Sequence, residues 1–521
     1  MRMTLSSLRG AVFDVAVIGG GINGASAAQQ LAAAGYRTLI VEKGDFGSGS
    51  TARSSRLLHC GLRYLAPGRS MFDFVRRPAR FVEAMRMARQ AMQARSDVVR
   101  TSPSSVNRMQ FCFPIYRGDR YRGWQLDAAF RILSALGPAD PPLDYERLAP
   151  GAAAQRPLIR WLRDFDSLDS VAVFREYQLD WPERICMDAV LEAERLGAVA
   201  RNYTLARLIT RDRSGGWSIA LEDVPAAEPD IRIRAKLVLN MAGIWIDDVI
   251  RSANPSAERK ILGTKGCHIV VRLPDECRGY GIATLNSRQE PFYCIPWHDL
   301  HYFGPTETVY EGDRDRICVT EDEIEWIVGE ANRLLPPLKL TRTDVISTWA
   351  GVRPLTYDAA LLAGRRSREI HDLQSDGLPD VLAMTAGPVM THRSAGQELL
   401  EVVKSRLSPS GPERDRSYAP SPLRFTRDRL IDVGHLGPAQ WASLASKVEG
   451  EHAVSLTDFL FRRTGLAWRR LLSDDEIRQA ANAIALQLGW PSHQIELEIE
   501  KYQAEVRSLH SPPNPLSEAA E

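Results

Sequence analysis

Residues 13–24 read Phe-Asp-Val-Ala-Val-Ile-Gly-Gly-Gly-Ile-Asn-Gly, an apolar run that passes directly into a cluster of glycines. The valine-rich half, residues 13–18, predicts a buried strand of a parallel sheet. The alanine-rich segment 25–34 predicts a helix, and Gly35 suits the C′ position that ends a helix. A second strand is predicted over residues 38–41, so the chain opens with a βαβ unit.

Three glycines follow the first strand with the spacing G-x-G-x-x-G. Gly19 allows a tight turn, Gly21 lets the backbone approach a pyrophosphate, and Gly24 lets the helix pack closely on the strand. The pyrophosphate would then face the N-terminus of the helix, where free N–H groups favour anions. Glu42 ends the second strand, where a carboxylate accepts hydrogen bonds from ribose hydroxyls and repels a 2′-phosphate. These residues predict FAD or NAD as the cofactor, without choosing between them.

The composition sets wider limits on the class of protein. The chain has 521 residues, enough for two to four domains. Apolar residues make up 44% and charged residues 25%, which is ordinary globular usage and excludes wholesale disorder and fibrous classes. The 66 basic and 65 acidic residues leave a net charge of +1. We therefore expect no nucleic-acid partner, because no global field would hold one.

The cysteines and the N-terminus indicate the compartment. The seven cysteines are odd in number and form no C-x-x-C pair, which argues against a disulfide scaffold and against a metal site. The N-terminus lacks the apolar core of a signal peptide. The longest uncharged run, residues 15–36, contains five glycines and is interpreted as a strand, a turn and a helix. We expect a cytoplasmic protein that is not integral to a membrane.

A basic segment covers residues 69–100. It contains eight arginines and three acidic residues, so its net charge is 8 − 3 = +5. Val82, Met85, Ala88 and Met92 recur at helical spacing, which predicts an amphipathic helix. Such a helix either lies on the inner face of an anionic membrane or packs by one face on the core with its arginines solvated.

Further elements are predicted along the chain. Residues 100–165 are rich in proline and aromatic residues and show little periodicity. Helices are predicted at 188–196, 322–335, 477–488 after a capping box at 473–476, and 495–509. Strands are predicted at 198–203, 217–222, 232–239, 267–273, 292–296 and 301–304. The last three strands suggest a second, more antiparallel sheet inserted into the first domain.

Longer segments resemble the FAD-dependent glycerol-3-phosphate dehydrogenases, which belong to the D-amino-acid-oxidase-like flavoprotein superfamily. The resemblance covers nearly the whole chain. It is carried by residues 13–24, GSTARSSRLLHCGLRYL (49–65), KGCHIVV (265–271), PTET (305–308), GVRPL (351–355) and DFLFRRT (458–464).

The resemblance implies FAD as the cofactor. It implies oxidation of sn-glycerol 3-phosphate to dihydroxyacetone phosphate, with hydride passing from C2 to flavin N5 and electrons on to a membrane quinone. The helix that follows residues 391–393 would point its N-terminus at the flavin pyrimidine ring. The residues expected to bind FAD are Gly19, Gly21, Asn23, Gly24, Glu42, Lys43, Ser50, Thr51, Ser54, Ser55, Ala242, Gly243 and Thr391.

The resemblance also implies a substrate site. A phosphate dianion needs fixed cations, and arginine supplies planar bidentate donors. Arg63 and Arg353 match family positions near the substrate and flavin, and His268 matches a histidine that would take the hydroxyl proton. The structural alternative to these roles is that Arg353 braces a turn, Arg63 pairs with a local acid and His268 is a core histidine whose hydrogen bonds are satisfied. The expected catalytic residues are His268, Arg63 and Arg353, and the same three with Tyr64, His392 and Arg393 form the expected substrate-binding set.

The sequence departs from the family pattern around residues 386–393, which read AGPVMTHR. Pro388 stands where the family has lysine, and His392 where it has tyrosine. Cys60 stands where the family has glycine. These departures concern the substrate more than the cofactor, and another polyol phosphate, such as a tetritol phosphate, is the alternative.

We predict an α/β protein that combines a Rossmann-like FAD-binding domain with an inserted, mostly antiparallel substrate domain and a C-terminal helical domain. The predicted bounds are 11–75, 170–258 and 345–405 for the FAD-binding domain, 76–169 and 259–344 for the substrate (cap) domain, 406–424 for a linker, 425–510 for the helical domain and 511–521 for a disordered tail.

Two functions outside this group stay open. An amine or amino-acid oxidase on the same fold would use the arginines to hold a carboxylate and oxygen to accept electrons. A catalytically weakened flavoprotein would serve as a binding module. The segments 61–64 and 351–354 favour the dehydrogenase, while the oligomeric state and the attachment of the flavin stay open.

Overall fold

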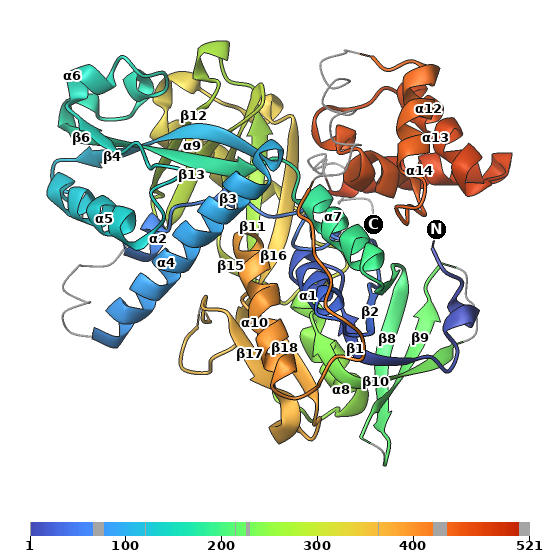
Figure 1. Ribbon diagram of the computed structural model, residues 1–521. Coiled ribbons are helices and arrows are strands. Elements are labelled where there is room, and N and C mark those ends of the chain that lie inside the picture. The colour runs from blue at the N-terminus through green and yellow to red at the C-terminus, as the bar shows by residue number, and fades with distance from the viewer. Residues whose placement is uncertain are drawn as a thin grey trace. The chain divides into compact units, whose positions relative to one another are not determined.

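The computed structural model describes residues 2–65, 78–119, 121–213, 215–225, 230–362, 364–419 and 435–509 (Figure 1). The chain divides into two compact units. Unit 1 comprises Met1–Ser54, Trp181–Gly263 and Arg353–Glu505, and unit 2 comprises Ser55–Asp180, Thr264–Val352 and Val506–Glu521. The domain bounds expected from the sequence stay a prediction.

Unit 1 contains, within the described residues, an eight-stranded sheet with the order β17-β18-β10-β1-β2-β7, in which β9 pairs with β10 and β8 with β9. Strands β18, β10, β1, β2 and β7 are parallel to one another, whereas β17 pairs with β18 in the antiparallel sense. The strands are β1 (Val12–Ile18), β2 (Thr38–Val41), β7 (Val199–Arg201), β8 (Thr204–Arg211), β9 (Trp217–Asp223), β10 (Ile231–Asn240), β17 (Glu369–Asp372) and β18 (Val381–Thr385). The predicted α/β class and the opening βαβ unit are confirmed.

Helix α1 of unit 1 packs against both α7 and α10 beside this sheet. The capping box predicted at residues 473–476 is present, because Ser473 Oγ accepts a hydrogen bond from the Glu476 N–H. The helices are α1 (Ile22–Ala33), α7 (Pro182–Arg195), α8 (Ile246–Ala253), α10 (His392–Lys404), α12 (Pro438–Lys447), α13 (Asp474–Leu488) and α14 (Ser492–Leu509), with a π-helical segment at Asp458–Arg463.

Unit 2 is built, within the described residues, on a ten-stranded sheet with the order β15-β11-β14-β13-β12-β4-β6-β3, in which β16 pairs with β11 and β5 with β6. It is mostly antiparallel, as predicted, with one parallel pair between β12 and β4. Its strands are β3 (Leu57–Leu58), β4 (Val106–Tyr116), β5 (Glu146–Leu148), β6 (Leu168–Leu179), β11 (Ile261–Val271), β12 (Tyr280–Leu285), β13 (Pro291–Trp297), β14 (Leu300–Gly304), β15 (Thr308–Val309) and β16 (Ser347–Thr356). Its helices are α2 (Leu62–Leu65), α4 (Pro78–Thr101), α5 (Gly123–Leu136), α6 (Pro150–Ala153) and α9 (Glu321–Leu334).

The segment 100–165 is more regular than its sequence suggests. It contains β4, which pairs with β6 along its whole length, and the helix α5. In β4 buried and partly buried residues do not alternate, so the period of two that marks a half-buried strand is absent. Pairing with a distant strand therefore specifies β4 where the local pattern does not.

The basic helix has one buried face. Its described part is α4, and the start of the predicted segment, residues 69–77, lies outside the described residues. Ala88 and Met92 are buried, as predicted. Val82 is 67% exposed, so the prediction that it belongs to the packed face is wrong. The buried face instead includes Arg95, whose guanidinium donates to the carbonyl of Pro141. Packing of one face on the core is therefore observed, and membrane contact stays a prediction.

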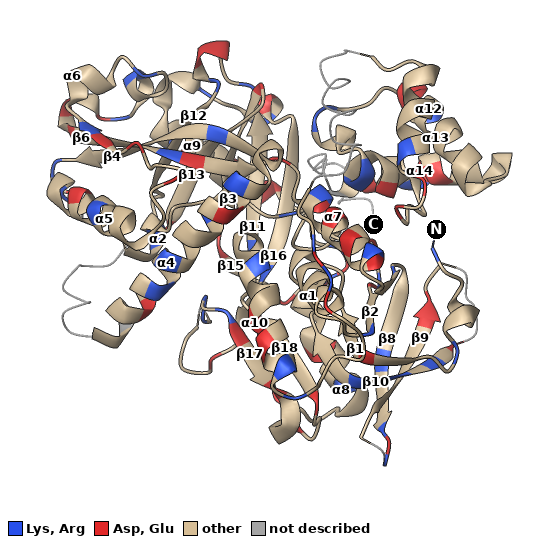
Figure 2. Ribbon diagram, viewed as in Figure 1, with Lys and Arg blue, Asp and Glu red and all other residues tan. Residues whose placement is uncertain are grey.

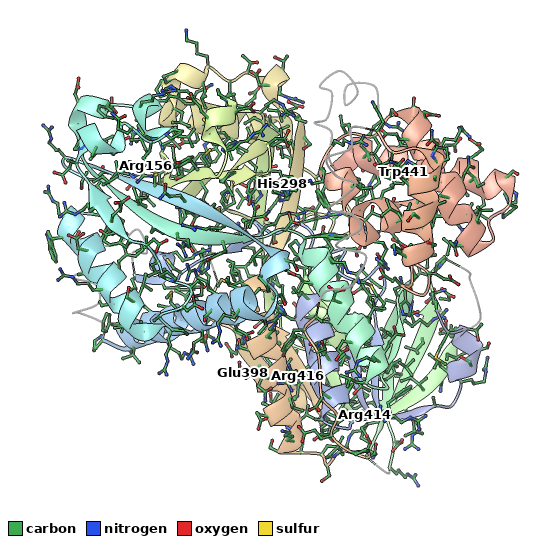
Figure 3. The ribbon with its side chains drawn as sticks, turned by 45° about the horizontal axis from the view of Figure 1, so that its top comes forward. Arg156, His298, Glu398, Arg414, Arg416 and Trp441 are labelled. Atoms are coloured by element: carbon green, nitrogen blue, oxygen red, sulfur yellow. The ribbon has the colours of Figure 1, made fainter. Side chains whose placement is uncertain are left out.

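The predicted linker begins as a segment that lies against α1 and α7. The Gly411 N–H donates to the carbonyl of Gly35 at 2.8 Å, and the Arg414 N–H donates to that of Ala33 at 2.7 Å. The guanidinium of Arg414, labelled in Figure 3, reaches the carbonyl of Leu196 at 2.8 Å. Residues 420–434 and the predicted disordered tail lie outside the described residues. No helix within the described ranges is long and apolar enough to cross a membrane.

Candidate functional site

The glycine turn between β1 and α1 has the backbone geometry that its sequence predicts. Gly19 has φ +113°, and a Cβ atom there would lie 2.4 Å from the carbonyl oxygen of Met241. A Cβ atom on Gly24 would lie 2.0 Å from the carbonyl oxygen of Gly19. Both positions therefore exclude a side chain, one because of the turn and the other because helix and strand are in close contact.

The N-terminus of α1 has open space in front of it. A Cβ atom on Gly21 would meet one atom within 4 Å, Thr51 Oγ1 at 3.4 Å, and this hydroxyl accepts a hydrogen bond from the Ile22 N–H at 3.0 Å. The Asn23 amide nitrogen donates to the carbonyl of Gly387 at 2.8 Å. Its amide oxygen is buried and has no hydrogen-bond partner among the described residues. An acceptor without a donor suits a ligand that carries hydroxyl groups.

Glu42 stabilises the loop that follows β2. Its Oε2 accepts from the Gly20 N–H at 2.7 Å and its Oε1 from the Gly44 N–H at 2.9 Å, while burial raises the pKa of this carboxyl. Each carboxylate oxygen has a further lone pair, so hydrogen bonds from a ribose remain compatible with these contacts. The ammonium group of Lys43 lies 3.9 Å from the ring centroid of Trp245.

His268 lies in an aromatic slot within unit 2. It belongs to β11, is 2% exposed, and stacks on Trp349 with the ring centroids 4.8 Å apart. Its Nε2 lies 3.1 Å from the hydroxyl of Ser55, and the Tyr302 hydroxyl donates to the Ser55 carbonyl at 2.7 Å. A Cβ atom on Gly304 would lie 2.8 Å from the imidazole, so this side of the ring is also closed. The slot therefore holds the imidazole in one orientation.

Arg63 and Tyr64 lie in the short helix α2 of the same unit. Arg63 is half-buried, forms no ion pair with a described residue, and lies with its guanidinium carbon 6.0 Å from the ring centroid of Tyr64. Burial and the charge of Arg63 lower the pKa of the neighbouring His59 to about 3. Pairing of Arg63 with a local acid is therefore not observed among the described residues.

Three further predicted residues lie where α10 begins in unit 1. His392 is buried and its Nδ1 donates to the carbonyl of Val389 at 2.9 Å. The guanidinium carbon of Arg393 lies 4.0 Å from the ring centroid of Tyr418. Thr391 donates from its hydroxyl to the carbonyl of Pro388. These contacts stabilise the turn into α10, and substrate binding by His392 and Arg393 stays a prediction.

Known proteins share both the sequence pattern and this fold. A family profile described as FAD dependent oxidoreductase (DAO) matches residues 14–396. The chain belongs to the FAD-dependent oxidoreductase family. FAD is accordingly its cofactor, as the resemblance implied.

Several members of this family are similar over much of the chain. A protein named glycerol-3-phosphate dehydrogenase from Synechocystis is 30% identical over 95% of this chain and 96% of its own length. The aerobic glycerol-3-phosphate dehydrogenase of Bacillus subtilis is 24% identical over 83% of this chain and 73% of its own. The crystal structure of glycerol-3-phosphate dehydrogenase from Bacillus halodurans complexed with FAD has a TM-score of 0.70 at 20% identity, covering 97% of this chain and 96% of that one. The last comparison supports the fold.

The residues of unit 1 fit the cofactor of the FAD-dependent oxidoreductases. Gly21 leaves room at the helix N-terminus, where backbone N–H groups favour a pyrophosphate. The buried amide oxygen of Asn23 has no hydrogen-bond donor among the described residues, and a hydroxyl group of FAD would be a suitable one. The second loop at the same edge of the sheet follows β10, where the Ala242 N–H is held by Asn240 Oδ1 at 3.3 Å and Gly243 has φ +58°.

The predicted site residues are divided between the two units. Arg353 belongs to unit 1 and lies in β16. The carbonyl of the next residue, Pro354, accepts a hydrogen bond from the Ala386 N–H at 2.7 Å. Most predicted cofactor residues lie in unit 1, whereas Ser55, Arg63, Tyr64 and His268 lie in unit 2. The unit 1 residues are Gly19, Gly21, Asn23, Gly24, Glu42, Lys43, Ser50, Thr51, Ser54, Ala242, Gly243, Arg353, Thr391, His392 and Arg393.

One cation at the start of α10 was missed by the sequence analysis. Arg368 donates to the backbone carbonyl of Thr391 and to the hydroxyl of Ser394, both at 3.3 Å, and pairs with Glu398 at 2.5 Å. It therefore brings a guanidinium to the turn that contains Pro388, where the resemblance led us to expect a lysine. No motif includes Arg368, so only the folded chain reveals its position.

Cys60, the other departure from the family pattern, borders a buried carboxyl group. The Cys60 N–H donates to Glu176 Oε1 at 2.9 Å, and the Arg95 Nε atom lies 3.9 Å from Glu176 Oε2. Burial raises the pKa of Glu176 to about 7, although the charge of Arg95 opposes this. A carboxyl whose pKa is higher in the folded than in the unfolded state stabilises the fold fully at pH values below its unfolded-state pKa, near 4.5. This contribution is lost as the pH rises through the folded-state pKa, about 7.

We therefore expect Glu176→Gln to change the pH dependence of stability. Relative to this variant, the wild-type protein should lose up to about 3 kcal/mol of unfolding free energy between pH 4.5 and pH 8. Denaturant unfolding of both proteins at pH 5 and pH 8 measures the difference between their unfolding free energies. The contributions of groups that titrate in both proteins cancel in this difference. A constant difference across this range would contradict the expectation.

Proposed function

We propose that this FAD-dependent oxidoreductase oxidises sn-glycerol 3-phosphate to dihydroxyacetone phosphate and passes the electrons to a quinone. The observation that supports the substrate is the similarity, over 95% of the chain, to a protein named glycerol-3-phosphate dehydrogenase. The half-buried guanidinium of Arg63, which has no carboxylate partner among the described residues, supports an anionic substrate.

The proposed chemistry divides between cofactor and protein. FAD, when bound, would supply the acceptor, flavin N5, for the hydride of substrate C2. His268 takes the proton of the C2 hydroxyl at a ring nitrogen, and stacking on Trp349 keeps its ring in one plane. Arg63 and Arg353 bind the phosphate dianion through planar bidentate hydrogen bonds. Thr391 precedes the N-terminus of α10, and the dipole of this helix would stabilise negative charge on a flavin ring held there.

The test of the substrate is anaerobic reduction of the bound flavin. We expect the purified protein to be yellow and glycerol 3-phosphate to bleach the flavin absorbance without oxygen. Bleaching by a tetritol phosphate alone would select another polyol phosphate, which Pro388 and His392 make the first alternative. Bleaching by a D-amino acid or sarcosine would select the oxidase, and FAD that none of these donors reduces would select the binding module.

The quinone and a peripheral membrane contact belong to the same proposal. The described part of the basic segment, α4, carries arginines along its length (Figure 2). Phe81 and Val82 near its start are exposed. Exposed apolar side chains beside arginines suit the interface of an anionic bilayer. We expect faster quinone reduction in vesicles with anionic lipids than in zwitterionic vesicles. Equal rates in both would contradict membrane contact, and reduction of oxygen alone would contradict the quinone.

A further inference from the structure

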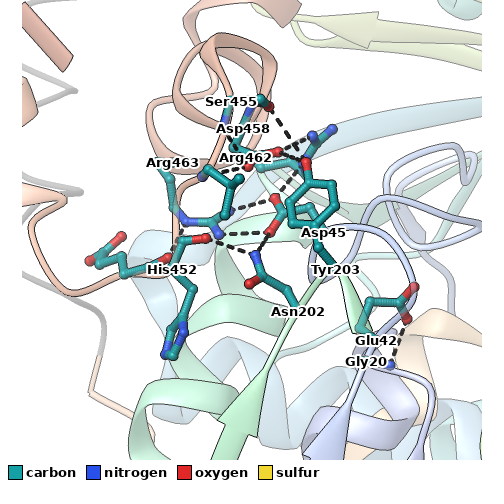
Figure 4. A network of polar contacts seen from close by, with 12 residues as sticks. Gly20, Glu42, Asp45, Asn202, Tyr203, His452, Ser455, Asp458, Arg462 and Arg463 are labelled. Carbon is teal, nitrogen blue, oxygen red and sulfur yellow. Dashed lines mark hydrogen bonds and ion pairs between the residues drawn. The ribbon is translucent and has the colours of Figure 1, made fainter. Parts of the chain in front are cut away.

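Two arginines of the C-terminal region reach the loop that follows β2. Arg463 and Arg462 lie in the π-helical segment Asp458–Arg463, which the sequence resemblance includes without giving it a role. Arg463 makes a bidentate contact with Asp45, with Nη1–Oδ2 and Nη2–Oδ1 both 2.8 Å (Figure 4). The Arg462 Nε atom lies 2.5 Å from Asp45 Oδ2. The side chains of Asp45 and Arg463 are both 0% exposed.

The cluster is balanced in charge. Asp458 also pairs with Arg462, so two carboxylates face two guanidinium groups. Burial opposes the ionisation of Asp45, but Arg463 and Arg462 outweigh it and hold the pKa of this carboxyl below its ordinary value. Asn202 donates to Asp45 Oδ1 at 2.8 Å, and Tyr203 donates to Asp458 at 2.7 Å. The carboxylates of Asp45 and Asp458 therefore both receive hydrogen bonds from within this cluster.

The same loop carries Glu42, three residues before Asp45. Glu42 holds the N–H groups of Gly20 and Gly44, and the Gly47 N–H donates to the carbonyl of Gly20 at 3.0 Å. On its other side, the carbonyl of Gly44 accepts from the Tyr203 N–H at 2.7 Å. Residues 42–47, here called the Glu42 loop, are therefore fixed to the glycine turn by one end and to the C-terminal region through Asp45.

We propose that Arg463 and Arg462 are positioning residues for FAD, because they hold the Glu42 loop in the conformation that receives the adenosine ribose. This inference rests on the proposed placement of FAD along the first βαβ unit. A buried carboxylate that faces two guanidinium groups has one favourable arrangement, since any displacement leaves buried charges without partners. The C-terminal region would therefore contribute to cofactor affinity without touching the cofactor.

The experiment compares FAD binding by apoproteins of three variants. Asp45→Asn removes the negative charge and keeps the shape, and Arg463→Lys keeps the charge but loses the bidentate geometry. Glu451→Gln is the matched control, because it removes the buried ion pair with Arg184 at 2.6 Å, which joins the C-terminal region to α7 outside the Glu42 loop. Flavin fluorescence gives the dissociation constant of FAD, and thermal unfolding is followed with and without FAD.

We expect Asp45→Asn and Arg463→Lys to raise the dissociation constant of FAD at least about tenfold, or about 1.4 kcal/mol. The rise in unfolding temperature that FAD produces should shrink in both. Glu451→Gln should lower the unfolding temperatures with and without FAD alike and leave the dissociation constant within about twofold. In the double variant, Asp45→Asn and Arg463→Lys together should weaken FAD binding by less than the sum of their single effects, because both break the same contact.

Two results would overturn the inference. One is a wild-type dissociation constant in Arg463→Lys, and the other is equal weakening in all three variants, which would assign the region a general structural role. If Asp45→Asn does not fold, Arg463→Lys and Glu451→Gln decide. The measurement uses no substrate, so a protein that binds FAD as expected but is not reduced by glycerol 3-phosphate would refute the proposed function alone.

Discussion

Replacing His268 by glutamine is expected to lower kcat for glycerol 3-phosphate by about 10²- to 10⁴-fold, the usual contribution of a positioned general base. Glutamine retains hydrogen-bonding capacity towards Ser55 but does not accept a proton. Because this contact with Ser55, an expected FAD-binding residue, is kept, the variant should retain its FAD. Anaerobic stopped-flow measurement of flavin reduction separates the chemical step from reoxidation by the acceptor.

The control for this variant is another buried imidazole of the same sheet. His301 lies on β14, where its residue pairs with Val271 of β11, and its Nε2 is 3.1 Å from the carbonyl of Cys277. Burial lowers its pKa to about 4, so His301→Gln changes no charge near neutral pH. We expect flavin reduction in this variant to stay within about threefold of wild type. A similar loss in both variants would mean that His268 acts through stability.

The second large effect is expected at Gly21, where alanine should raise the dissociation constant of FAD about 100-fold, or about 2.8 kcal/mol. The added methyl group meets one protein atom, 3.4 Å away, so the apoprotein should keep its wild-type unfolding temperature. It would, however, occupy the space that the pyrophosphate needs at the N-terminus of α1. FAD titration of the apoprotein measures the change.

Two other glycines provide the comparison. Gly24→Ala places its methyl carbon 2.0 Å from a backbone oxygen, so it should destabilise the apoprotein itself, by about 3 kcal/mol. Gly329→Ala, in the middle of α9, meets nothing within 4 Å and should stabilise the protein by about 0.5–1 kcal/mol. FAD binding by Gly21→Ala at wild-type affinity would show that the pyrophosphate lies elsewhere.

The parts of the fold that depend on neighbouring residues follow from the sequence. The second strand, residues 38–41, and the capping box at 473–476 are found where they were predicted. The roles of Gly19 and Gly24 in the turn also follow, because both depend on short-range steric contacts. The strand β4 does not follow, because its partner β6 lies about 60 residues away and its burial does not alternate.

The candidate site was predictable only where a motif identifies it. The link between Asn23 and Gly387 joins residues 364 positions apart, and no spacing rule connects them. Arg368 belongs to no motif, and the segment 458–464 matched the family without an indication of what its arginines contact. These residues acquire their meaning from long-range contacts, which a single sequence does not display.

The pairing of Asp45 with Arg463 has a consequence for biosynthesis. The two residues are 418 positions apart, so Asp45 leaves the ribosome long before its partner is translated. Until then the Glu42 loop lacks the guanidinium groups that compensate the buried Asp45 carboxylate. On the proposed role of this pair, a nascent chain holds its flavin weakly, and firm incorporation of the cofactor waits until Arg463 has been translated.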